Sequence, residues 1–336
     1  MIVIFNCIFP VTCNTGPMLS RSILLATLSL LPFGVSAQEP VSVVATVGMI
    51  GDIAQTLGGD CIAVQTMMGP GIDPHLYQAT ARDVQTLNRA DLILYSGYGL
   101  EGQLGDVFAR YAERVPTLAV SEAGIARETL ISTDNAYGVD PHLWMDVSLW
   151  ANIVPVMAAQ LSESAPGCAA TISANAEGYG AELAALDEWT RQTIASIPRT
   201  QRILVTAHDA FAYYGRAYDI EVAGIQGIST QSEAAIADIR QTADLIVARE
   251  VPAIFVESTI NPRTIQAVVE AANQAGQPVK IGGQLFSDAM GDPDTAGGNY
   301  IGMIHSNTAA IAEALGGTPA PLPQALADWA AQWSIE

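Results

Sequence analysis

Two of the four histidines in this chain lie in the same short frame, Gly-(Ile/Val)-Asp-Pro-His-Leu, at residues 71–76 and 138–143. The frame places His75 and His142 directly after a proline. Proline fixes its own φ and restricts the residue before it, which stiffens the loop that carries the histidine. A stiff loop holds an imidazole at one angle, as a metal ligand requires. One such frame is most simply a hydrogen-bonded loop, but two in a histidine-poor chain favour a metal site.

The second half of the chain offers further metal ligands. His208 follows a strand-like run at 203–206, and a fourth ligand is expected in the same half. The stretch GGQLFSDAMG places Asp288 in a loop just after another strand-like run, although spacing alone does not separate Asp288 from Asp292. The candidates for the fourth ligand are Asp209, Asp219, Glu257, Asp288, Asp292 and His305.

Strand-like and helix-like segments alternate along the chain, which indicates βα units around parallel sheets. The ligand candidates fall near the carboxyl ends of predicted strands, where open α/β sheets bind ligands. The predicted strands are 43–47, 62–67, 92–95, 116–120, 203–206, 253–256 and 279–281. The predicted helices are 48–57, 80–89, 147–161, 232–249, 262–275 and 307–315.

A single long helix is predicted at 169–197, which contains no proline and is followed by Pro198. A helix of this length suits a rigid strut between two lobes. We therefore predict an α/β fold of two lobes, each with a parallel sheet flanked by helices, joined by one long rigid helix. The expected N-terminal lobe is 38–165, the linking helix segment is 166–198 and the C-terminal lobe is 199–336.

The N-terminus has the pattern of an export signal. From Met18 the chain carries Arg21, an apolar run and the small residues Ser36-Ala37, which form a cleavage site. We predict a cleavable signal peptide in residues 1–37, with Met18 as the true start. No cysteine lies in a lipidation box, so a free periplasmic protein is expected rather than a lipoprotein.

The mature chain keeps two cysteines, Cys61 and Cys168. An oxidising compartment permits a disulfide between them. Sequence alone does not distinguish a disulfide from two buried thiols, because it does not give the geometry that a bridge needs.

Composition excludes several functional classes. The formal net charge is −20, so no basic patch is available for nucleic acid and an anionic membrane surface would repel the protein. The sequence lacks a His-Glu-x-x-His helix, a phosphate-binding Walker loop and a Gly-x-Ser-x-Gly elbow. Three imidazoles and a carboxylate can close a metal shell, which favours holding a metal over using it. The alternative that we keep is an exported zinc-dependent hydrolase on the same ligands.

The chain resembles the TroA-like solute-binding proteins of zinc and manganese ABC importers, also called the cluster A-I metal-binding family. The resemblance covers nearly all of the mature chain. It rests on GPGIDPHLYQATARDV, GVDPHLWMDV, LVTAHDAFAYYGRAYDIEVAGIQGIST, FVEST and GGQLFSDAMG.

The resemblance implies a non-enzymatic, monomeric periplasmic carrier that binds a metal ion and delivers it to an ABC permease. It implies four metal ligands, His75, His142, His208 and Asp288, and thereby selects Asp288 over Asp292. It implies that Glu257 supports a metal ligand without binding the metal itself. It implies no ligand role for His305, which is expected to be structural.

The metal cargo is expected to be Zn²⁺ or Mn²⁺, with Fe²⁺ as a further candidate. Zinc-specialised relatives often carry a histidine-rich loop, whereas residues 125–139 here contain no histidine. Manganese-specialised relatives often have glutamate where this chain has His208. Imidazoles suit zinc, and manganese lies below it in the usual affinity order. Because only neutral imidazoles bind, we expect affinity to fall below about pH 6.5.

Overall fold

The structure is a computed structural model that describes Gly16 and residues 39–134 and 138–335. The predicted signal peptide and start residue lie outside the described residues. Residues 39–335 belong to one compact unit. Among the described residues, no helix has the length and apolar character needed to cross a membrane.

The first lobe contains a four-stranded parallel sheet with the strand order β2-β1-β3-β4. Its buried central strands are rich in Val, Ile and Leu, as expected for strands covered on both faces. The helix α2 begins with a capping box, in which the side chains of Thr80 and Asp83 bond each other's backbone N–H. The strands are β1 (Val41–Val47), β2 (Ile62–Met68), β3 (Leu92–Tyr95) and β4 (Thr117–Ala119). The helices are α1 (Gly48–Gly58), α2 (Ala81–Leu87), α3 (Leu104–Tyr111) and α4 (Val120–Gly124).

The second lobe contains two parallel strand pairs, β5 with β6 and β7 with β8. Strand β5 lies beside β7, so the carboxyl ends of both pairs meet at one edge. The strands are β5 (Ile203–His208), β6 (Glu221–Gln226), β7 (Ala253–Glu257) and β8 (Lys280–Leu285). The helices are α8 (Ala212–Tyr218), α9 (Ile236–Arg249), α10 (Arg263–Gln274) and α11 (Tyr300–Ala314).

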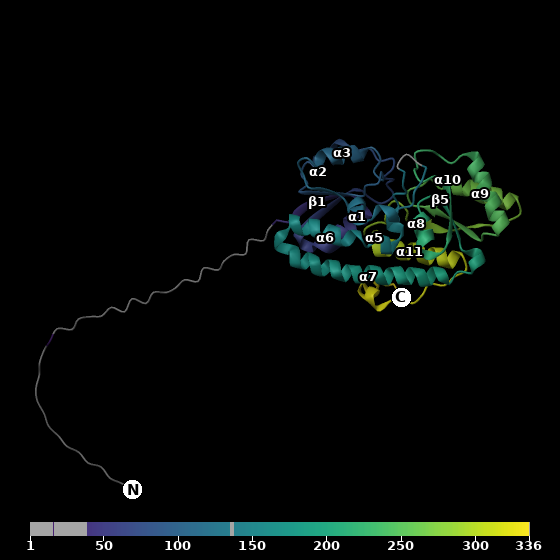
Figure 1. The fold of residues 1–336 in the computed structure, drawn as a ribbon. Helices are drawn as coiled ribbons and strands as arrows, with labels where there is room; N and C mark the ends of the chain where they lie inside the picture. Colours follow the sequence, from purple (N-terminus) through teal and green to yellow (C-terminus); the bar gives the residue numbers. More distant parts are fainter. Residues whose placement is uncertain (1–15, 17–38, 135–137, 336) are drawn as a thin grey trace, which may run out of the picture. The chain divides into compact units, whose positions relative to one another are not determined.

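The long helix α7 (Ala169–Ala195) has 27 residues, which corresponds to roughly 40 Å of axis at ~1.5 Å per residue. It runs along both lobes and packs against α1 and α6 (Ile153–Ser164) of the first and α11 of the second (Figure 1). One continuous hydrophobic cluster includes side chains of both lobes and of α7. The predicted two-lobe α/β fold with one long helix is therefore confirmed, and the helix is part of a shared core.

Several predicted elements differ from the structure. The expected helix 147–161 is two helices, α5 (Val147–Trp150) and α6, separated at Ala151 and Asn152. Helix α11 starts at Tyr300, well before the predicted 307, because Asn299 caps it by accepting a bond from Gly302 N at 2.9 Å. Helix α9 starts at Ile236 rather than at 232.

Other elements escaped prediction because their local signals are weak. Helices α3, α8 and α12 (Ala327–Trp333) have eight residues or fewer, which leaves little room for a helical period. Strand β6 has the sequence EVAGIQ, in which a glycine interrupts the strand pattern.

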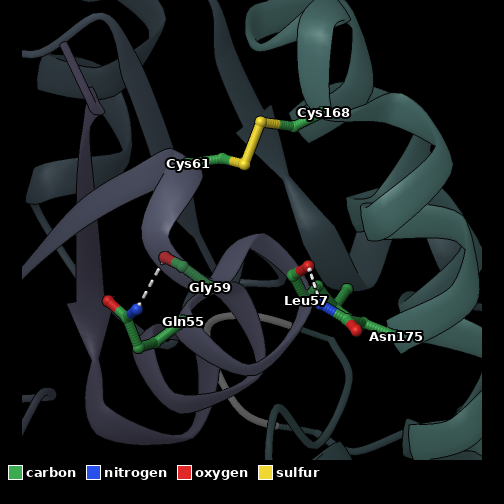
Figure 2. The surroundings of a disulfide bond; sticks show 6 residues. All are labelled: Gln55, Leu57, Gly59, Cys61, Cys168 and Asn175. Carbon is green, nitrogen blue, oxygen red and sulfur yellow. Dashed lines mark hydrogen bonds between the residues drawn. A yellow bond between two sulfur atoms is a disulfide. The ribbon is translucent and has the colours of Figure 1, made fainter. Parts of the chain in front are cut away.

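A disulfide joins Cys61 to Cys168, with their Cα atoms 6.4 Å apart, and decides the question that the sequence left open (Figure 2). Cys61 ends a short 3-10 turn before β2, and Cys168 lies directly before α7. Asn175 of α7 adds a nearby link, donating from Nδ2 to Leu57 O at 2.9 Å. The disulfide and this hydrogen bond tie the start of the long helix to the end of α1.

We predict that loss of this disulfide lowers the free energy of unfolding by about 2–4 kcal/mol, because the bridge closes a long loop in the unfolded chain. Urea denaturation of oxidised protein, of reduced protein and of the Cys61→Ser/Cys168→Ser variant measures the effect. Equal midpoints for oxidised and reduced protein would contradict it.

Candidate metal centre

The structure brings His75, His142, His208 and Asp288 together, with ligand atoms within 4.8 Å of one another. His75 lies in the loop between β2 and α2, and His142 lies directly before a 3-10 turn (Leu143–Met145). His208 is the last residue of β5, which extends two residues beyond the predicted end at 206, and Asp288 lies in the loop after β8. All four are buried, with exposed fractions of 4% or less.

The imidazoles all direct Nε2 toward the same point. The Nε2 atoms of His75 and His142 are 3.2 Å apart. Asp288 Oδ1 lies 3.4 Å from His142 Nε2, and its Oδ2 lies 3.3 Å from His208 Nε2 and 3.8 Å from that of His75. Ligand atoms about 2.0–2.1 Å from a tetrahedral ion are separated by roughly 3.3 Å. The donor set and its spacing therefore fit a divalent transition metal.

The polar atoms of this centre need a partner that the protein does not supply. Both carboxylate oxygens of Asp288 and Nε2 of His208 are buried and lack a well-formed hydrogen bond within the described chain. Such atoms are rare in native proteins because each unpaired group carries a desolvation cost. A cation at the centre would satisfy Asp288 and Nε2 of His208 together.

The aspartate of each Asp-Pro-His frame also fixes its loop. Asp73 Oδ1 accepts from His75 N at 2.8 Å, and Asp140 Oδ1 accepts from His142 N at 2.9 Å. Each is an Asx turn, which reinforces the restriction imposed by the proline. The proline of each frame was predicted to stiffen the loop, whereas the role of the aspartate was not predicted, although an Asp two residues before the histidine is the usual signal for such a turn.

Two carboxylates orient two of the imidazoles. Asp140 Oδ1 also lies 2.7 Å from His142 Nδ1, and Glu257 Oε2 contacts Nδ1 of His208. A carboxylate beside Nδ1 keeps the proton there, so that Nε2 presents its lone pair to the metal. Glu257 Oε1 also accepts from the His208 backbone N at 2.9 Å. Both contacts agree with the expectation that Glu257 supports a metal ligand.

Buried contacts hold the Asp288 loop on both sides. The Asn307 side chain of α11 accepts from Phe286 N at 2.8 Å and donates to Phe286 O at 2.7 Å. Trp144 Nε1 donates to Ser287 O at 2.8 Å. Because Trp144 follows His142 by two residues, this bond joins the loops of two ligands from opposite lobes. Neither Asn307 nor Trp144 was singled out from the sequence.

The carboxylates decide the charge state of two imidazoles. Burial alone lowers the pKa of His142, but Asp140 and Asp288 outweigh it and raise that pKa to about 9. Burial likewise lowers the pKa of His208, and Glu257 and Asp288 raise it well above its usual value. Burial also lowers the pKa of His75, to about 4, and Asp288 offsets this only in part. Burial raises the pKa of Asp288, but His208 and His142 hold it well below its ordinary value.

The remaining candidates for the fourth ligand do not join the cluster. His305 stacks on Trp189 at 4.6 Å and contacts Trp329 at 5.1 Å, and burial lowers its pKa to about 4. Asp219 pairs with Arg202 at 3.3 Å on the surface, and Asp292 is exposed. The packing of His305 between aromatic rings agrees with the structural role expected for it.

Comparisons with known proteins show the family to which the chain belongs. Residues 43–314 match the family described as zinc-uptake complex component A, periplasmic. The chain belongs to this family. The manganese-binding lipoprotein MntA of Bacillus subtilis is 42% identical over 302 residues, covering 88% of this chain and 98% of that protein. The zinc-binding protein TroA of Treponema pallidum is 42% identical over 273 residues, covering 81% and 88%.

Solved structures of family members have the same fold. The periplasmic zinc-binding protein TroA from Treponema pallidum matches with a TM-score of 0.80 and 43% identity, covering 82% of this chain and 99% of that one. The Fe(III)-bound YtgA from Chlamydia trachomatis matches with a TM-score of 0.75 and 26% identity, covering 83% and 99%. The family is that of the substrate-binding proteins of metal ABC importers, and these matches give no support to the hydrolase alternative.

We predict that metal binding releases protons between pH 7 and 9. A proton on Nε2 competes with the metal, so affinity rises with pH through the pKa of each metal-free imidazole. The raised pKa values of His142 and His208 move this window above the pH of about 6.5 expected for ordinary histidines. Affinity should rise roughly tenfold per pH unit for each proton released.

Calorimetric titration with zinc at pH 7.5, in buffers of different ionisation enthalpy, counts the released protons. An observed binding enthalpy that does not depend on the buffer would contradict the assigned charge states.

Proposed function

We propose that this protein captures zinc and/or manganese outside the cytoplasm and delivers the ion to the permease of an ABC importer. His75, His142, His208 and Asp288 act as the metal ligands. The observation that carries the proposal is the convergence of three Nε2 atoms and both Asp288 oxygens on one buried point.

The electrostatics of the site favour a cation. Asp288 supplies a buried negative charge whose two oxygens face different imidazoles, so that either oxygen or both can bind the ion. Asp140 and Glu257 add two more buried carboxylates directly behind the ligand rings. Their negative charge favours the dipositive metal and makes the nitrogens stronger donors.

The arrangement suits a carrier better than an enzyme. The four protein ligands complete a tetrahedral shell, whereas a catalytic zinc keeps a position open for water. Helix α7 packs against both lobes, so we infer that the ion enters and leaves through modest shifts of loops. The carrier acts as a monomer, and its partner is the membrane subunit of the permease.

We keep zinc and manganese together as cargo, with Fe²⁺ as a further candidate. The two relatives at 42% identity are named for different metals, manganese and zinc. The Chlamydia trachomatis homologue is described with Fe(III). Three imidazoles favour zinc by affinity, but metal supply also decides which ion is carried.

We further propose a periplasmic location, with Met18 as the true start and a signal peptide that is cleaved after residue 37. The mature chain then consists of lobes 38–165 and 199–336 joined by 166–198. The absence of a lipidation box favours a free protein, although the Bacillus subtilis relative is named a lipoprotein. Mass spectrometry of the protein from its native cells is expected to find an unmodified N-terminus at Gln38. A lipid-modified or later start would contradict this.

We predict that metal-stripped protein binds one zinc or manganese ion with submicromolar affinity. His75→Ala and Asp288→Ala should each weaken binding by at least about tenfold, because each removes a donor from the shell. His305→Ala is the matched control, since His305 lies outside the cluster, and it should keep the wild-type affinity and stoichiometry. Isothermal titration calorimetry measures all four proteins.

Wild-type protein without submicromolar binding of either metal would refute the carrier function. Unchanged affinity in both His75→Ala and Asp288→Ala would refute this site.

A further inference from the structure

The two Asp-Pro-His loops differ in how they are joined to the second lobe. The loop of His142 is held by several buried bonds. Tyr213 donates from its hydroxyl to Asp140 O at 2.9 Å, and Trp144 donates to Ser287 O at 2.8 Å. The Tyr300 hydroxyl donates to Trp144 O at 2.7 Å. These bonds hold the His142 loop in a fixed position against the second lobe.

Loop 69–78, which carries His75, is held much more lightly. Within the described chain, one hydrogen bond joins this loop to the second lobe, from Thr230 Oγ1 to Asp73 Oδ2 at 2.5 Å. The other oxygen of Asp73 accepts from His75 N. A single carboxylate therefore binds both the backbone of a metal ligand and the opposite lobe.

The contact continues into the strand pair that carries His208. Gln226 Nε2 donates to Thr230 O at 3.0 Å and to Ser232 O at 2.5 Å, which fixes the loop that presents Thr230. Gln226 is the ladder partner of His208 at the end of β6. His75 is thus connected to His208 through Asp73, Thr230 and Gln226, by a route that includes no metal atom.

The His75 loop also lies on the solvent side of the site. His75 lines a cavity of about 560 Å³, whose other walls include Gln103, Val107 and Gln231. Ile72 and Leu76 of the same loop are 41% and 52% exposed. Asp73 is half-buried, so water can replace the Thr230 hydroxyl when the loop moves. Breaking this bond does not leave a charge buried without a partner.

We propose that the Asp73–Thr230 hydrogen bond is a clasp that holds loop 69–78 closed over the metal. The metal enters and leaves the site when this loop moves aside. Thr230 is then a positioning residue that controls the rates of metal capture and release. The inference rests on the proposed carrier function and goes beyond it, because it names the part of the site that opens.

The test compares zinc kinetics in full-length mature protein by stopped flow. Capture is measured by mixing stripped protein with zinc, and release by mixing loaded protein with excess chelator. Thr230→Val removes the hydroxyl and nearly keeps the side-chain shape, whereas Thr230→Ser keeps the hydroxyl. Ser229→Ala is the matched control, because Ser229 lies in the same loop and accepts a bond from Gln231 N rather than contacting Asp73.

Thr230→Val should speed both capture and release by roughly tenfold, equivalent to about 1.4 kcal/mol in each barrier. The dissociation constant then changes little, whereas a residue needed only for structure would lower the affinity. Thr230→Ser and Ser229→Ala should stay within roughly twofold of wild type, since both keep the clasp. In an Asp73→Asn background, Thr230→Val should add no further acceleration, because the two residues form one interaction.

Three results would overturn the clasp: wild-type rates in Thr230→Val, faster release with an equal loss of affinity, or Thr230→Ser behaving like Thr230→Val. Wild-type protein that fails to bind zinc and manganese would instead refute the carrier function. Tight wild-type binding with unchanged Thr230→Val kinetics refutes the clasp alone.

Discussion

The burial of the Asp288 carboxylate among three imidazoles is the interaction on which the rest of the structure depends. A buried charge is costly unless it is paired. Here the paired groups come from four separate segments and from both lobes. The strand ends, the two Asx-turn loops and the Asn307 contacts can all be understood as means of bringing these groups to one point and holding them there.

The supporting acids add negative charge behind the imidazoles and so favour a cation at this centre. Asp140 and Glu257 occupy Nδ1 of His142 and His208, which leaves Nε2 for the metal. The same acids raise the pKa values of these rings, so protons compete with the metal near neutral pH. Helix α7 and the shared core keep the lobes together, and motion is left to loops. Within the described chain, the loop of His75 has fewer hydrogen bonds to the opposite lobe than the loop of His142 has.

Much of the fold was predictable because it has local signals. The buried strands of the first lobe are apolar runs, the long helix has no proline until Pro198, and Thr80 with Asp83 forms a capping box. The elements that were missed lack such signals: β6 contains a glycine, and α8 has seven residues. The start of α11 was missed because its cap, Asn299, lies in an irregular segment that was not assigned to any element.

For the site, the sequence by itself determined the ligand types and the stiff Asp-Pro-His loops, because proline and Asx chemistry act within a few residues. It placed His75, His142, His208 and Asp288 near strand ends, and resemblance to a family chose Asp288 over Asp292. Only the tertiary structure decided that Glu257 contacts the ring of His208, that Cys61 bonds Cys168, and that Thr230 reaches Asp73. These contacts join residues far apart in the chain. Their partners are set by how the lobes pack, and packing leaves no periodic or short-range mark in the sequence.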